Sequence, residues 1–134
     1  MVRPICKDVL ILSRKSTNAT KADLPTAADL LDTLVANKEI CVGMAANMIG
    51  VNKRIIAVNT GFLVMLNPTI TKGGEIYETE EGCLSIPGIR KARRFHTITV
   101  RYQDRTMTWR TETFTGYTAQ IIQHEIDHCN GVLV

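Results

Sequence analysis

The chain has 134 residues, of which 45% are apolar and 22% charged, and its net charge is +3. These values are typical of a soluble globular protein, and we expect residues 1–134 to form a single domain. No stretch approaches the ~18 consecutive apolar residues of a membrane-spanning helix, and no secretory signal opens the chain. The four cysteines are too scattered for a disulfide framework. We therefore expect a cytoplasmic protein without a membrane partner.

The basic residues are concentrated in the run Arg90-Lys91-Ala92-Arg93-Arg94. This run lacks the interleaved aromatic side chains that would stack on bases. We interpret it as a solvated loop or strand edge, and we expect no nucleic-acid partner.

The predicted elements begin with a helix at residues 25–40, where apolar side chains recur at helical spacing, after an irregular polar segment at 13–23. Buried and alternating apolar patterns then predict strands, at residues 54–59, 62–66, 70–71, 74–78, 96–102 and 106–115. Pro68 should end the second of these strands. A last helix, 117–129, ends at Asn130-Gly131. This order predicts an α+β fold with mostly antiparallel sheets around the C-terminal helix.

The most informative feature is the segment His124-Glu125-Ile126-Asp127-His128. Residues four apart lie on the same face of a helix, so the two imidazoles can bind one metal ion. Glu125 projects about 100° away from His124 and can still take a proton from a water molecule at that ion. The alternative, two unrelated surface histidines, is weakened because the chain has only three histidines.

A catalytic metal site needs a third protein ligand and one open position. The candidates are His96, which lies in an alternating strand and is expected to pack or face solvent, and Cys83. Cys83 follows Gly82, where the backbone can approach closely, and a cation would hold its sulfur as thiolate. A cysteine alone is more often a core residue than a ligand, but beside the histidine pair Cys83 is the preferred third ligand.

Three motifs follow one another along the chain: Gly43-Met44-Ala45-Ala46, Glu81-Gly82-Cys83-Leu84-Ser85 and Gln123-His124-Glu125-Ile126-Asp127-His128. In order and spacing they resemble the motifs of the peptide deformylase family, and the similarity covers nearly the whole chain. The resemblance implies a metal-dependent hydrolase that removes the formyl group from the N-terminal formylmethionine of newly made proteins and releases formate. Its partners would be N-formylmethionyl peptides or nascent chains.

The resemblance also implies a role for individual residues. Cys83, His124 and His128 would bind one divalent metal ion, Fe²⁺ in the cell, which Ni²⁺, Co²⁺ or Zn²⁺ can replace. Glu125 would be the general base and then the acid, and the backbone N–H of Leu84 would help to hold the oxyanion. The substrate-binding residues would be Val42, Gly43, Met48, Tyr117 and Ile121.

The chain departs from the family pattern at several positions. The family's first motif has glycine and glutamine where this chain has Cys41 and Met48. A thioether cannot donate a hydrogen bond to an oxyanion, and the loss of one such donor typically costs about 10²- to 10³-fold in turnover. Tyr117 and Gln120 stand where aliphatic residues are usual, so the pocket should be more polar or narrower. The ribosome-docking helix of many bacterial members is expected to be absent.

We carry three functional hypotheses forward. The first is an active deformylase. The second is a deformylase-like paralogue that binds metal with little or no turnover and acts as a binding or regulatory module, for which Met48 is the main evidence. The third is a zinc endopeptidase, because His-Glu-x-x-His also marks those enzymes, but no downstream His or Glu follows His128 as a third ligand. A purely structural metal would need four protein ligands, and Cys129 points about 100° away from His128.

Overall fold

The computed structural model describes all residues, 1–134. Its elements are α1 (Val9–Leu12), a 3₁₀ turn (Lys21–Asp23), α2 (Leu24–Ala36), β1 (Gly43–Ala45), a second 3₁₀ turn (Ala46–Ile49), β2 (Ile55–Val58), β3 (Leu63–Gly82), β4 (Ile89–Gln103), β5 (Trp109–Thr115) and α3 (Gly116–Cys129). All strands belong to one sheet in the order β1-β2-β3-β4-β5, and each neighbouring pair is antiparallel. The predicted α+β class is confirmed. No helix in the structure combines the length and apolar character that crossing a membrane requires.

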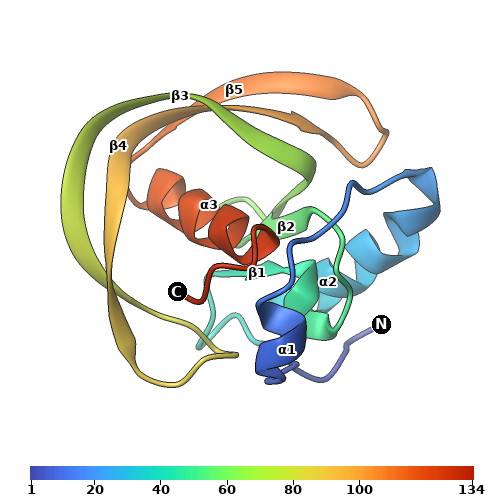
Figure 1. Ribbon diagram of the computed structural model, residues 1–134. Helices are drawn as coiled ribbons and strands as arrows, with labels where there is room; N and C mark the ends of the chain where they lie inside the picture. The colour runs from blue at the N-terminus through green and yellow to red at the C-terminus, as the bar shows by residue number, and fades with distance from the viewer.

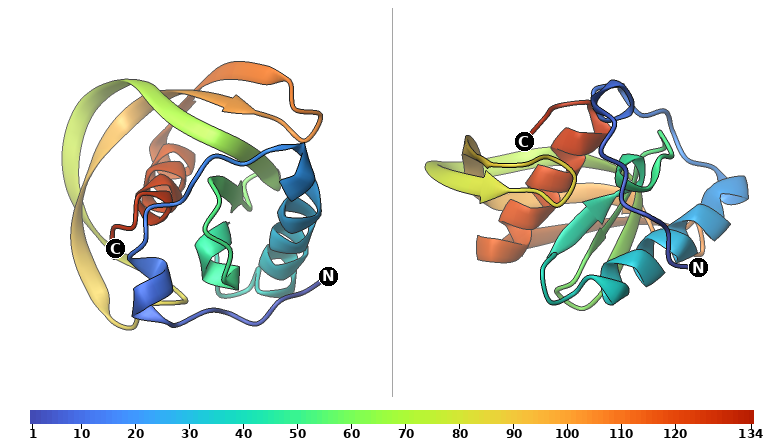
Figure 2. Two further views of the ribbon diagram at one scale, coloured as in Figure 1. Left: turned by 45° about the vertical axis from the view of Figure 1, so that its right-hand side comes forward. Right: turned by 90° about the horizontal axis from the view of Figure 1, so that it is seen from below.

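Strand β2 lies between two apolar cores, which explains its uninterrupted apolar sequence. Alternate side chains of a strand point to opposite faces. Ile55 and Ala57 therefore pack with α2 in the first core, and Ile56 and Val58 pack with α3 in the second. The two helices lie on opposite sides of this part of the sheet (Figure 2).

The long hairpin of β3 and β4 curves around α3 (Figure 1). The prediction of three separate strands between residues 62 and 78, with Pro68 as a terminator, is wrong, because β3 runs without a break from Leu63 to Gly82. The register shifts between Leu66 and Thr69, so Pro68, which has no N–H to donate, lies in a bulge rather than in the ladder. The end of the hairpin carries the second motif, which begins at Glu81, to the face of α3.

Two further predictions need correction. Helix α2 ends at Ala36 and not at residue 40. The basic run lies within β4, and although Lys91 and Arg93 are exposed as predicted, Arg94 is only 6% exposed. A buried guanidinium must be paired, and Arg94 is paired with the carboxylates of Glu81 and Asp127.

Candidate metal centre

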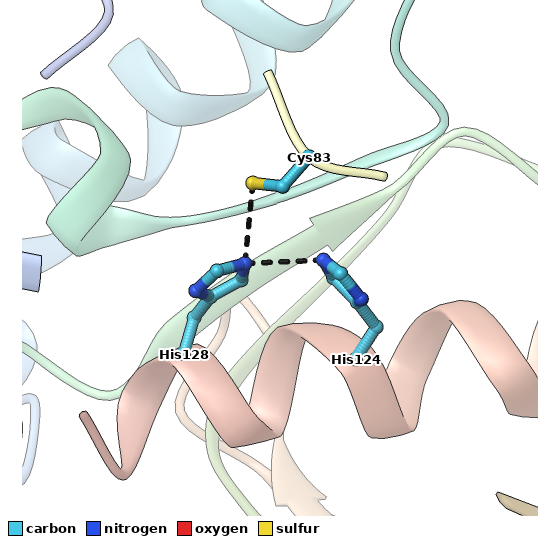
Figure 3. A group of neighbouring side chains, drawn as sticks. All are labelled: Cys83, His124 and His128. Carbon is cyan, nitrogen blue, oxygen red and sulfur yellow. Dashed lines mark hydrogen bonds between the residues drawn. The ribbon is translucent and has the colours of Figure 1, made fainter. Parts of the chain in front are cut away.

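The structure brings together Cys83, His124 and His128 (Figure 3). Cys83 comes directly after the end of β3, and both histidines lie on one face of α3. The Nε2 atom of His128 lies 3.3 Å from the Cys83 sulfur and 3.1 Å from Nε2 of His124. Two nitrogens bound tetrahedrally at about 2.0–2.1 Å from one ion would lie about 3.3 Å apart. The three donor atoms therefore fit a single divalent ion.

The two imidazoles differ in their protonation in the metal-free protein. His128 is fully buried, and burial, followed by the nearby His124 and Arg94, lowers its pKa to about 3, so the ring is neutral. His124 uses its Nδ1 to hydrogen-bond Oε1 of Glu81 at 2.8 Å. Burial opposes protonation of His124, but its hydrogen bonds to Cys83 and Glu81 outweigh burial and raise its pKa to about 10, so the metal-free ring carries a proton on both nitrogens. A bound metal ion would take the place of the Nε2 proton, while Nδ1 would still donate to the charged Glu81. His96, the other candidate ligand, is exposed on β4 and does not belong to the group.

A buried ionic network contacts His124 on the Nδ1 side of its ring. Both carboxylate oxygens of Glu81 accept from Arg94, at 2.6 and 2.9 Å, and Arg94 also donates to Asp127 on α3 at 2.6 Å. Burial opposes ionisation of Glu81, but the hydrogen bonds from His124 and Arg94 outweigh it and lower its pKa to about 2. Glu81 is therefore a carboxylate at every physiological pH, and it links the hairpin to the ligand helix.

Glu125 is a buried carboxyl group beside the three ligands. It is 3% exposed, and its Oε1 has no hydrogen-bond partner in the protein. Burial raises its pKa to about 7, which is the range that suits a group that both accepts and donates a proton. Gly43 permits this arrangement, because a methyl group at that position would lie 2.6 Å from Cγ2 of Ile121 and 2.9 Å from Oε2 of Glu125.

A cavity of about 490 Å³ opens beside these groups. Most of the predicted site residues line this cavity, namely Val42, Gly43, Cys83, Leu84, Tyr117, Ile121, His124 and Glu125. Cys41, Glu81 and Gln120 line it as well. Met48 does not line the cavity. It is 1% exposed in the apolar core next to α2, where its sulfur accepts from the backbone N–H of Ala45 at 3.5 Å.

Sequence reasoning missed the residues that hold the site from outside. In the sequence, Glu81 stands out only as part of a motif, and Arg94 only as one member of a basic run. The detectable signal was the alternation in β3, where Tyr77, Thr79 and Glu81 share the less exposed face while Glu78 and Glu80 are exposed. A charged residue on the covered face of a strand implies a partner.

One thiolate, two imidazoles and a buried carboxyl group around an open cavity are the components of a mononuclear metal-dependent hydrolase. The comparisons with known proteins identify the family. The family model for polypeptide deformylase matches residues 2–134. The peptide deformylase of Clostridium beijerinckii is 53% identical, and the alignment covers all of both chains.

Solved structures agree with this assignment. An actinonin-bound class I type b peptide deformylase from Acinetobacter baumannii superposes with a TM-score of 0.90 at 31% identity, covering 99% of this chain and 95% of that one. The peptide deformylase of Thermus thermophilus gives 0.88 at 34% identity, covering 99% and 84%. The chain belongs to the polypeptide deformylase family, and it is a metal-dependent hydrolase that removes the N-formyl group from formylmethionine, releasing formate. The hypothesis of an active enzyme is thus favoured over the paralogue without turnover and over the endopeptidase.

Proposed function

We propose that Cys83, His124 and His128 bind one divalent cation, and that this cation is Fe²⁺ in the cell. The convergence of the three donor atoms within 4.8 Å of one another carries the proposal. One thiolate with two imidazoles also suits Ni²⁺, Co²⁺ and Zn²⁺, so these ions should replace iron in the purified protein. A bound cation would polarise the formyl oxygen and acidify a water molecule.

The proton transfers are assigned to Glu125. Its carboxylate takes a proton from the attacking water and later delivers it to the amine that leaves when the C–N bond breaks. Its burial supports both steps, because a pKa near 7 allows the group to exist in either form at neutral pH. The backbone N–H of Leu84, which lines the cavity next to Cys83, is assigned to the developing oxyanion.

The substrate backbone is assigned to the edge of the sheet. Strand β1 is the terminal strand and pairs only with β2, so its other edge is the side to which an extended peptide could add. Val42 and Gly43 supply this edge, and Tyr117 and Ile121 line the cavity for the methionine side chain. Met48 is assigned to the same site from its motif position, although its sulfur lies in the core.

In the cell the substrates would be N-formylmethionyl nascent chains in the cytoplasm, and residues 1–134 would act as a single domain. A related structure supports a short peptide as ligand, because a deformylase from Acinetobacter baumannii with Met-Ala-Ser bound superposes with a TM-score of 0.87 at 30% identity.

The experiment is a formate-release assay on formyl-Met-Ala-Ser, with protein purified anaerobically and its metal content measured. Formate should be released by the iron-loaded protein, and release should stop after chelation and return when Fe²⁺ is added. Glu125→Gln should retain the metal and lose turnover. Unchanged turnover in this variant would remove Glu125 as the base, and metal stoichiometry unchanged by Cys83→Ser would contradict the ligand assignment.

A further inference from the structure

Gln120 connects the candidate metal centre to strand β3 of the hairpin. It lies one helical turn before His124, and the two side chains share a face of α3. Its Nε2 donates to Oε2 of Glu81 at 3.0 Å, and its Oε1 accepts from the hydroxyl of Tyr77 on β3 at 3.2 Å. The ionised carboxylate of Glu81 can only accept, so the amide nitrogen of Gln120 faces Glu81 and the amide oxygen faces Tyr77, whose hydroxyl donates to it. Tyr77 therefore anchors the other end of the Gln120 amide.

The donation from Gln120 completes the hydrogen bonding of Glu81. An ionised carboxylate has about four acceptor positions. Arg94 occupies two of them, His124 occupies the third through Nδ1, and Gln120 occupies the fourth. With all four positions filled by donors, the carboxylate cannot rotate without breaking several bonds, and Oε1 stays directed at the ring of His124.

We propose that Gln120, oriented by Tyr77, is a positioning residue for Glu81 and, through Glu81, for the imidazole of His124. The inference rests on the proposed role of His124 as a metal ligand. The partner of a ligating imidazole fixes its tautomer and ring orientation, and loss of such a partner typically costs about 10–100-fold in metal affinity. Gln120 is one hydrogen bond further from the imidazole than Glu81, so its loss should lower the metal affinity by about tenfold.

The test measures the Zn²⁺ affinity of the metal-free full-length protein by competition with a chelating dye. Gln120→Met keeps the length of the side chain and removes both hydrogen bonds, and Tyr77→Phe removes only the hydroxyl. Each should weaken Zn²⁺ binding by about tenfold, within the range for outer-shell partners. Matched controls are Gln103→Met and Tyr102→Phe, whose hydrogen bonds join other parts of the sheet, and both should bind Zn²⁺ like the parent protein.

The double variant Gln120→Met/Tyr77→Phe separates a connected pair from two independent contacts. If Tyr77 acts through Gln120, the double variant should bind Zn²⁺ no more weakly than Gln120→Met alone. Additive losses would overturn the connection, and affinities of both single variants equal to the parent's would overturn the proposal as a whole.

A spectroscopic measurement distinguishes positioning from a general loss of stability. In the zinc-loaded protein, the Nδ1 proton of His124 should give a protected NMR signal that exchanges faster with water in Gln120→Met, while the signals of the core strands stay unchanged. An unaltered His124 signal beside weaker binding would contradict the proposal. If the parent protein bound Zn²⁺ and responded as described but released no formate, the proposed function would fail and the positioning role would stand.

Discussion

Glu125 is both the proposed proton carrier and a destabilising residue, and a single substitution should reveal both properties. Its pKa lies near 7 in the folded, metal-free protein instead of the ordinary 4.5, because burial penalises the charged form. Below pH 4.5 the carboxyl group is protonated in the folded and the unfolded chain, so it does not affect stability. Between 4.5 and about 7 only the unfolded chain releases the proton, and rising pH therefore favours unfolding.

The size of the effect follows from that interval. At ~1.4 kcal/mol per pH unit, Glu125 lowers the free energy of unfolding by about 3 kcal/mol above pH 7. Glu125→Gln removes this titration. The free energy of unfolding of the variant minus that of the parent should therefore rise by about 3 kcal/mol from pH 4.5 to pH 8. The new amide contributes equally at both pH values and cancels from this comparison. Turnover of the loaded enzyme should meanwhile fall by about 10²- to 10⁴-fold.

The assay is urea unfolding of the chelator-treated protein at the two pH values, combined with formate release by the metal-loaded protein. Glu39→Gln, at an exposed position, is the control, and it should change the free energy of unfolding by less than about 0.5 kcal/mol at either pH. An equal difference between parent and Glu125→Gln at pH 4.5 and pH 8 would refute the reasoning, because it would mean that the folded carboxyl group titrates normally.

Three other substitutions probe the surroundings of the site. Gly43→Ala should cost about 1–3 kcal/mol in urea unfolding and should also reduce formate release, because the methyl group would displace Glu125. Arg94→Met should destabilise the protein by about 3–5 kcal/mol, because the buried Glu81 carboxylate loses its guanidinium partner and keeps only the bonds to His124 and Gln120. The exposed Arg93→Met should stay within about 0.5 kcal/mol. Met48→Gln should raise turnover in the formate assay by about 10²-fold if the amide restores an oxyanion donor, and an unchanged rate would show that this position does not contribute.

The parts of the site that could be predicted from sequence are those set by local geometry. His124 and His128 are four residues apart on a helix, and that spacing alone aligns their side chains. The apolar run of β2 likewise predicted a buried strand. Cys83 is predicted as a ligand by the chemistry of the ligand set and by a motif, because no local pattern indicates where a hairpin end will lie. The fold brings its sulfur to 3.3 Å from Nε2 of His128.

The remaining parts depend on contacts between distant residues. The pairing of Glu81 with Arg94 arises from the fold of the hairpin, in which Arg94 lies opposite Tyr77. The sequence around residues 62–78 does not predict one continuous strand, because a proline normally ends a strand. Strand β3 continues past Pro68 only because this residue lies in a bulge. Met48 was expected at the substrate from its motif, but the apolar core also accommodates a thioether.

The alternation of β3 explains how one strand serves the metal centre in several ways. Glu81 lies four positions after Tyr77, an even interval, so both side chains face α3, and Cys83 continues that spacing just beyond the end of the strand. The strand and the residue just after it thus bring to α3 the proposed ligand Cys83, the carboxylate bonded to His124, and the phenol bonded to Gln120. The helix alone fixes how His124 and His128 lie relative to each other. The position of Cys83 and Glu81 beside them therefore depends on the register of the hairpin. Arg94 holds that register from the neighbouring strand by binding Glu81 and Asp127 at once, which explains why a charged residue outside the proposed ligand set is buried beside it.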